Sequence, residues 1–365
     1  MATSPSLVLP RTRRAGGGWL HSPWWDLTFI SLSVVLVAIP YSGYRLMAAL
    51  GLAAATSATV VDLVVTLLIG GPHMYATFTR TVADPNFRAK HRVIIATSVL
   101  IPVAVVVLGY GAFPVLLTLF FFWASVHVLH QIVFLVECYN RRGHRHLSLL
   151  DRGVDYAVVL TSLYPIAMYR LVHGTFNLSG ITLPFPTFLQ HDWVIWAAFA
   201  AFGLSLALFL AKTVREIKEG YVHWPKFLLI SLTVIVSFLL PGADRLDSAF
   251  QGFNTWHSFQ YLGLTWYANR LAMERHELKS PLTRKIAGPH DAWRYYGAMV
   301  LCTLGAGAIL GLLMLLRGPL GLTPEQPYYM TVLSFLLIHY YHDHVLFAHP
   351  EAIVAEATDY QIKPA

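Results

Sequence analysis

Charge is the scarcest property of this sequence. Only 12% of its 365 residues are charged, whereas a soluble domain carries roughly 25%. The net charge of +7 does not indicate nucleic-acid binding, because the basic residues fall in short segments between apolar runs. We therefore exclude a nucleic-acid partner and expect an integral membrane protein.

Cysteine and the common catalytic signatures are also missing. The two cysteines, Cys138 and Cys302, lie far apart in apolar segments, so there is no disulfide framework and no CxxC pair. The sequence contains no HExxH, no GxSxG, no Walker A motif and no GxGxxG fingerprint. These absences exclude a thiolate metal site and an ordinary zinc protease, and they leave no sign of a nucleotide site.

Long apolar runs are abundant in the sequence, and 56% of its residues are hydrophobic. A helix that crosses a bilayer needs about 20 apolar residues. Runs of this length predict an all-α polytopic bundle of about ten transmembrane helices. The expected spans are roughly 26–43, 46–70, 93–111, 113–138, 153–172, 192–212, 225–241, 247–271, 294–316 and 326–347. The second span could break at Gly70-Gly71-Pro72, because proline fits the first turn of a new helix.

Lysine and arginine predict the orientation of these spans. With a cytoplasmic N-terminus, all but four of the 26 basic residues fall on the cytoplasmic side. The exceptions are Arg45, Arg170, Arg245 and Arg317. We therefore expect a multi-pass protein with a single transmembrane domain over residues 21–350. Cytoplasmic tails over residues 1–20 and 351–365 would flank it.

Histidine is the residue type that indicates a functional site in this sequence. Three expected spans share one pattern, in which polar residues follow a histidine at the third and fourth positions: His127-Val-Leu-His130-Gln131, His257-Ser-Phe-Gln260-Tyr261 and His339-Tyr-Tyr-His342-Asp343. Such positions share one face of a helix, and an imidazole in hydrocarbon is costly unless it is paired or bound. All three spans run toward the cytoplasm, so their histidines gather between mid-membrane and the cytoplasmic face. We predict a metal site with ligands from His73, His127, His130, His257, His339, His342 and His344.

Three acidic residues near these histidines are candidate catalytic groups. Asp343 follows the third pattern, Glu137 lies two turns after the first histidine pair, and Asp62 lies three turns before His73. An acid at such depth should be paired or functional, as a ligand or as the partner that selects an imidazole tautomer. A single histidine in a membrane span is more often an interhelical hydrogen-bond partner than a ligand. The paired histidines are therefore stronger evidence for a metal site than His73 or His257.

The histidine pattern resembles that of integral-membrane histidine-box enzymes, which are desaturases, hydroxylases and alkane monooxygenases. The resemblance rests on a small part of the chain: His127, His130, His257, His339, His342 and His344. It implies non-haem iron, usually two ions, held by histidines on the cytoplasmic side of a helical bundle. The family's HxxxH and HxxHH boxes are absent, and the family usually has fewer spans. Gly71-Pro72-His73 is also similar to a Gly-x-Pro-His motif of membrane carotenoid-cleaving oxygenases, but Thr77 or Phe78 stands where an acid should follow.

These features predict a membrane oxidoreductase of lipid metabolism, of the monooxygenase type, that uses iron and O2 on a lipophilic substrate. Electrons would come from a cytoplasmic donor, and the basic loops would suit an acidic one. Two other hypotheses remain open. One is a zinc-dependent hydrolase of lipid amide or ester bonds, assisted by Ser125, Asp62 or Glu137. The other is a non-enzymatic protein that binds haem or transports metal.

Overall fold

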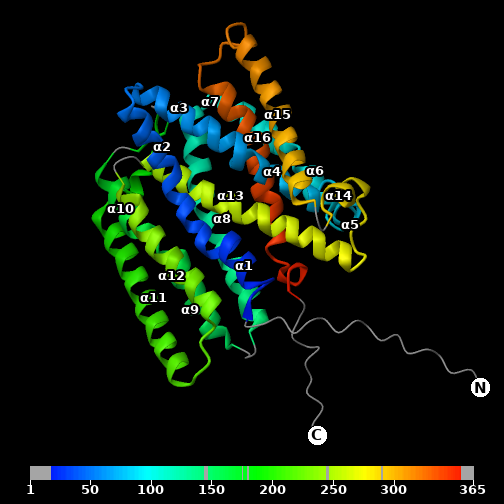
Figure 1. The fold of residues 1–365 in the computed structure, drawn as a ribbon. Helices are drawn as coiled ribbons and strands as arrows, with labels where there is room; N and C mark the ends of the chain where they lie inside the picture. The colour runs from blue at the N-terminus through cyan, green and yellow to red at the C-terminus, as the bar shows by residue number, and fades with distance from the viewer. Residues whose placement is uncertain are drawn as a thin grey trace, which may run out of the picture.

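The computed structural model describes residues 18–143, 147–174, 176–178, 181–243, 246–288 and 291–354. Most of the two expected tails, and Arg245, lie outside these ranges. The described part is almost entirely helical (Figure 1). Its small sheet has two antiparallel strands, β1 (Asn177–Leu178) and β2 (Ile181–Thr182).

The helical elements follow one another with short connections. In chain order they are α1 (Pro23–Trp25), η2 (Asp26–Ser31), η3 (Leu32–Val37), α2 (Ala38–Ala49), α3 (Ala54–Val65), η4 (Thr66–Gly70), α4 (Gly71–Arg80), α5 (Pro85–Lys90), α6 (Arg92–Thr97), α7 (Leu100–Gly111), α8 (Phe113–Arg142), α9 (Leu149–Thr161), α10 (Tyr164–His173), η5 (Thr187–Leu189), α11 (Asp192–Lys218), α12 (Trp224–Leu239), η6 (Leu240–Gly242), α13 (Leu246–Glu274), α14 (Pro281–Ile286), α15 (Ala292–Leu316), α16 (Gln326–Leu346) and η7 (Pro350–Ala352).

Seven helical segments of the described residues are long and apolar enough to cross a membrane. They are Pro23–Ala49, Ala54–Arg80, Arg92–Gly111, Phe113–Arg142, Asp192–Lys218, Trp224–Gly242 and Ala292–Leu316. The expectation of an all-α, multi-pass membrane bundle is therefore confirmed. The count of ten spans is not, because three expected spans are missing from this set.

Those three expected spans differ from the seven for physical reasons. The span expected at 153–172 is divided into α9 and α10, and Pro165 lies in the first turn of α10. The other two coincide with α13 and α16, which are long and continuous. Both carry buried histidines and other polar side chains, which make them less apolar than a lipid-facing helix.

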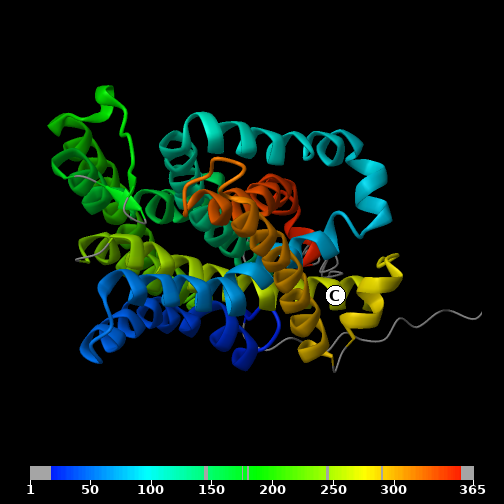
Figure 2. The same ribbon diagram turned by 90° about the horizontal axis from the view of Figure 1, so that it is seen from above.

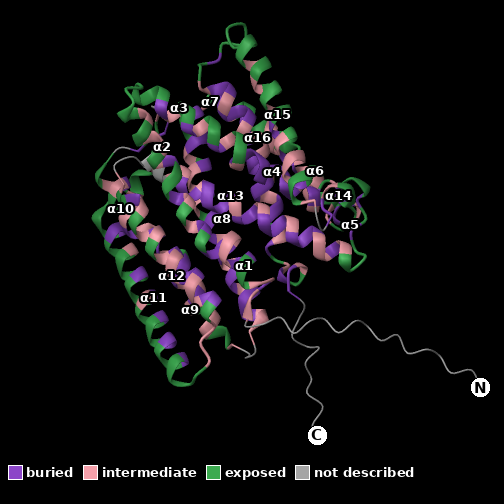
Figure 3. Cartoon of the chain, in the orientation of Figure 1, coloured by how far each residue is buried: buried purple, intermediate pink, exposed green. Residues whose placement is uncertain are grey.

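Helix α13 runs through the middle of the bundle (Figures 1 and 2). It contacts η3, α2 and α4 as well as α8 and η6. Helices α9, α10, α11 and α12 form one flank of the bundle, and α4, α7, α15 and α16 form the other. Buried residues are concentrated on α4, α8, α13 and α16, whereas α11 and α15 carry many exposed apolar side chains (Figure 3). The centre of the molecule is therefore where these four helices meet.

At Gly70-Gly71-Pro72 the helical run from α3 through η4 into α4 is not interrupted, but the helix type changes there, and Pro72 lies in the first turn of α4. The segment η4 is π-helical, and such wide turns are frequent near functional sites. Pro72 has no N–H for the carbonyl of Leu68, and the Tyr296 hydroxyl donates to that carbonyl instead, at 2.7 Å. The run therefore carries His73 into the bundle centre and not to a helix end.

Candidate metal centre

Four histidines and one aspartate from four different helices meet in the bundle centre. His73 comes from α4, His127 from α8, His257 from α13, and His339 and Asp343 from α16. All five are buried, with at most 3% of each residue exposed. We call these five residues the histidine cluster.

The four imidazoles of the histidine cluster form a closed circuit of ring contacts. Ring centroids are 4.7 Å apart for His73 and His339, and 5.0 Å apart for His339 and His127. They are 4.8 Å apart for His127 and His257, and 5.2 Å apart for His257 and His73. Each ring of the cluster therefore contacts two of the others.

The tautomer of His73 follows from its backbone neighbour. Its Nδ1 lies 2.5 Å from the carbonyl oxygen of Gly70. A carbonyl only accepts, so Nδ1 carries the hydrogen and donates it. The Ser258 hydroxyl lies 2.9 Å from the same nitrogen. The lone pair is then on Nε2, which has no hydrogen-bond partner and is free to bind a metal.

The hydroxyl groups of Thr77 and Tyr261 orient His339 and Asp343, as the Gly70 carbonyl orients His73. His339 Nδ1 lies 2.5 Å from Thr77 Oγ1, and Thr77 Oγ1 donates to Asp343 Oδ1 at 3.1 Å. The Tyr261 hydroxyl donates to that same Asp343 oxygen at 2.5 Å. With the Thr77 hydrogen on Asp343, His339 Nδ1 is the donor to Thr77, and the lone pair of His339 is on Nε2. Metal-binding histidines are held by partners of this kind.

Six ligand atoms of the cluster are buried and have no hydrogen-bond partner among the residues that the structure describes. They are His73 Nε2, His127 Nε2, His257 Nδ1, His257 Nε2, His339 Nε2 and Asp343 Oδ2. Leaving one such atom unsatisfied costs about 1–3 kcal/mol. Several unsatisfied atoms at one place indicate a site completed by something other than protein. A metal ion fits, because nitrogen and carboxylate oxygen are its ordinary ligands.

Two overlapping triads within the cluster have the spacing of metal ligands. In each triad the ligand atoms lie within 4.8 Å of one another: His73, His257 and His339 in the first, His127, His339 and Asp343 in the second. Asp343 Oδ2 lies 3.8 Å from His127 Nε2. A buried histidine cluster that can hold a metal ion is thus present, in agreement with the prediction from the sequence.

Three of the predicted histidine ligands lie outside the cluster. His130 is half-buried beside His344 and Phe347, with ring centroids 6.0 Å and 5.2 Å away, and His344 is exposed. His342 is buried, but its Nε2 lies 2.8 Å from Ser98 Oγ and its Nδ1 lies 3.0 Å from Thr81 Oγ1. Both nitrogens of His342 therefore have protein partners, which is the environment of a structural histidine.

The geometry of a helix explains which positions reach the cluster. On α16 the group that joins His339 is Asp343, four residues later, and not His342, three residues later. On α8 the residue four after His127 is Gln131, whose Nε2 donates to the His257 carbonyl at 3.2 Å. The sequence pattern located the polar face of each helix. The rotation of the helix about its axis decides which residues on that face reach the histidine cluster.

The three candidate acids have different surroundings. Asp343 belongs to the cluster. Glu137 accepts hydrogen bonds from Arg141 at 3.0 Å, from Arg152 at 3.1 Å and from Tyr156 at 2.5 Å, so it is part of an ion-pair network and not of the cluster. Asp62 accepts a hydrogen bond from Gln251 at 2.9 Å and lines a cavity that His73 also lines.

The sequence analysis gave no role to Ser258 or to the Gly70 carbonyl. It named Thr77 only where an acid was missing, and Tyr261 only as a polar member of the His257 pattern. The sequence spacing gave part of this information, because Thr77 follows His73 by four residues and Tyr261 follows His257 by four. No protein-family model matches the chain, and neither a curated protein nor a solved structure matches it. The function has to be argued from the site.

Proposed function

We propose that this chain is a membrane oxidoreductase that binds non-haem iron in the histidine cluster and uses O2 to oxidise a lipophilic substrate. The observation that carries the proposal is the donor set: four buried imidazoles and one buried carboxylate, each with an unpartnered ligand atom. Imidazole suits iron, copper, zinc and nickel, and sites that combine histidine and carboxylate with an open position are typical of non-haem iron oxygenases.

The number of donors supports one iron ion better than two. One iron ion could be held by either triad, with the other residues of the cluster as its neighbours. Two ions would have to share the same five residues, and His339 already belongs to both triads. Iron held in the cluster would supply the activation of O2.

The protein groups around the cluster would orient its ligands and exclude water. Thr77 and Tyr261 hold Asp343 Oδ1, which leaves Oδ2 directed at the histidines. The ring of Tyr340 stacks on His127 with centroids 4.0 Å apart, and Tyr340 is buried. Such a dry, preorganised site favours chemistry on a lipophilic substrate and protects a reactive oxidant from water.

The proposal includes a topology and an electron source. The chain would cross the membrane ten times, with the divided helix α9–α10 and the polar helices α13 and α16 as the additional spans. Both termini would then be cytoplasmic, where most basic residues fall. A separate cytoplasmic donor would deliver electrons to this basic face.

A zinc hydrolase is the second candidate, and a specific observation favours it. The triad of His73, His257 and His339 has the composition of a catalytic zinc site with three histidines, and Asp343 could act as a base. Haem is not supported by the geometry, because the four imidazoles contact one another at centroid distances of 4.7–5.2 Å and leave no slot for a porphyrin.

Metal analysis of the purified full-length protein tests the proposal. We expect about one iron per chain, no haem absorption band, and an electron paramagnetic resonance signal when nitric oxide is added as a stand-in for O2. One zinc per chain without iron would refute the proposal and favour the hydrolase. His127→Ala should lose the iron, whereas His130→Ala, one turn further along α8, should retain it.

A further inference from the structure

A cavity lies directly beside the histidine cluster, between η4, α8, α13 and α16. His73 forms part of its wall, and so does Tyr340, the residue whose ring stacks on His127. A molecule in this cavity would therefore lie next to two of the proposed metal ligands. This placement makes the cavity the natural position for a substrate.

One wall of the cavity carries a chain of hydrogen-bonded side chains. Gln251 donates to Asp62 at 2.9 Å, and Asn254 donates to Gln251 at 3.3 Å. Ser258 donates to Asn254 at 3.3 Å and lies 2.9 Å from His73 Nδ1. The chain thus begins at Asp62 and ends at the histidine cluster.

The remaining walls are mostly apolar. They include Phe120 of α8, Phe250 of α13, and Val332, Leu333 and Leu336 of α16. A hydrocarbon chain matches these walls, because burying apolar surface is favourable by about 25 cal/mol per Å². A hydrocarbon alone would place apolar surface against the hydrogen-bonded side chains of the polar wall.

We propose that this cavity binds the substrate of the metal centre, and that the substrate is a long-chain alcohol. The proposal rests on the function proposed above. A carboxyl group accepts hydrogen bonds, and a primary amide both donates and accepts, so the wall formed by Asp62, Gln251 and Asn254 matches a hydroxyl, which does both. A fatty-acid carboxylate would instead place a second acid beside Asp62, and like charges repel strongly at low dielectric.

The spacing along α13 predicts where the alcohol would react. Gln251 precedes His257 by six residues, which is roughly 9 Å along a helix axis. A hydroxyl held by Asp62 and Gln251 would therefore lie away from the cluster, and a carbon further along the chain would lie beside His73, which lines the same cavity.

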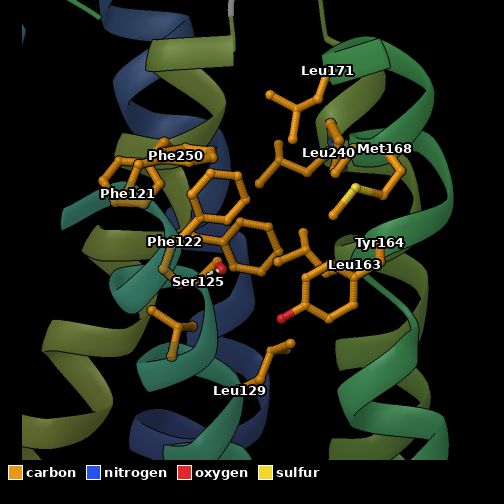
Figure 4. A pocket seen from close by; sticks show the side chains of 14 residues that line it. Phe121, Phe122, Ser125, Leu129, Leu163, Tyr164, Met168, Leu171, Leu240 and Phe250 are labelled. Atoms are coloured by element: carbon orange, nitrogen blue, oxygen red, sulfur yellow. Dashed lines mark hydrogen bonds between the residues drawn. The ribbon is translucent and has the colours of Figure 1, made fainter. Parts of the chain in front are cut away.

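A second cavity provides a matched control. It lies between α8, α10 and α13, and its wall is almost wholly apolar, with side chains such as Phe122, Leu163 and Met168 (Figure 4). Only Ser125 and Tyr164 bring side-chain oxygen atoms to it. It offers space for hydrocarbon without the acid and amide groups of the first cavity.

Binding of radiolabelled 1-decanol, decane and decanoate to the purified full-length protein tests the proposal. We expect 1-decanol to bind more tightly than decane or decanoate. Asp62→Asn should weaken 1-decanol binding roughly tenfold, because a bond to a charged acceptor is replaced by a neutral one, and should leave decane binding unchanged. Equal binding of 1-decanol and decane, or no effect of Asp62→Asn, would overturn the proposal.

Two variants that each place a phenylalanine in one of the cavities distinguish them. Val332→Phe fills the cavity beside His73 and should abolish 1-decanol binding, whereas Ala167→Phe fills the second cavity and should leave it intact. The reverse result would refute the assignment. Equal retention of 1-decanol by both variants, as expected if 1-decanol only partitions into detergent, would also refute it. Thermal unfolding verifies that both variants are folded.

Iron content, measured on the same samples, separates this inference from the proposed function. Protein that binds 1-decanol as expected but holds no iron would refute the iron enzyme and leave an alcohol-binding cavity. Protein that holds iron but shows no preference for 1-decanol would refute this inference alone.

Discussion

Two of the buried polar clusters in the described part of the bundle differ in how far the protein satisfies them. On the flank formed by α9, α11 and α12, Asp155 accepts from Lys212 and from Lys226 at 2.7 Å each. Lys212 also pairs with Glu216 at 3.0 Å, and Lys226 donates to Asn140 at 2.9 Å. The two cations and two anions of this lysine–aspartate cluster therefore compensate one another inside the protein.

The histidine cluster is the opposite case, because six of its buried ligand atoms have no partner. A cluster that completes itself stabilises the fold and needs nothing further. A cluster that remains incomplete is maintained at a cost to stability, which indicates that a ligand completes it. The two clusters should therefore respond in opposite ways to the loss of one member.

Loss of Asp155 should have the largest effect on stability. Asp155→Ala would leave Lys212 and Lys226 buried with fewer anionic partners, and breaking a buried pair typically costs about 3–5 kcal/mol. Unfolding of the purified protein would show this loss, while the folded fraction keeps its metal. Asp151→Ala is the matched control, one turn earlier on α9, because the Asp151–Arg215 pair is solvent-accessible. Equal losses in the two variants would contradict the assignment.

Loss of His257 should have the largest effect on metal binding. His257→Phe keeps a planar ring and removes both nitrogens, neither of which has a protein partner. Changes to residues that only orient metal ligands typically cost about 10–100-fold in affinity, so loss of a ligand should cost about 100-fold or more. The stability of the metal-free protein should not fall. Metal titration and unfolding measure both, and unchanged affinity would remove His257 from the site.

His342→Phe should show the reverse behaviour on a buried histidine outside the cluster. It removes hydrogen bonds to Ser98 and Thr81, which should lower the free energy of unfolding by about 1–3 kcal/mol. Metal content should stay at the wild-type level. A variant that folds normally but lacks metal would show that the centre extends to His342.

Thr77→Val should have a smaller effect on metal binding. The change keeps the shape of the side chain but removes the hydroxyl that links His339 to Asp343. We expect about tenfold weaker metal binding, at the lower end of the range for orienting partners. Thr79→Val is the control on the same helix, because Thr79 bonds to Asn269 and not to the cluster. Metal titrations of the two variants that coincide would contradict this role for Thr77.

The smallest effect is the pH dependence of Asp151, which lies outside the membrane-spanning segments. Partial burial raises its pKa, but hydrogen bonds with Arg215 and Ser148 lower it more, so its pKa lies below the usual range. Its contribution to stability is then complete above the pKa of the unfolded chain, about 3.9, and is lost as the pH falls through the lowered pKa. Asp151→Asn should be slightly less stable than wild type at pH 7 and should equal it at strongly acidic pH. A difference that persists in acid would contradict this account.

The two clusters also differ in how far they could be predicted. The histidine cluster was accessible to sequence analysis because its members recur on one face of apolar helices, which is a local pattern. The lysine–aspartate cluster was not, because Lys212 and Lys226 lie near span ends and count there as ordinary cytoplasmic charges. Their pairing with Asp155 joins α9 to α11 and α12 over separations of 57 and 71 residues, and no local pattern contains it.

By itself, the sequence determined the fold class and the presence of polar faces on apolar helices, because hydropathy and helical periodicity are local properties. It also placed α13 and α16 close to their observed bounds. The tertiary structure decided which residues on those faces meet: Asp343 and not His342 joins His339, and Gln131 and not His130 reaches α13. Residues three and four positions apart differ only in their direction around the helix axis. That direction depends on how each helix is rotated against its neighbours, and packing across the whole bundle sets the rotation.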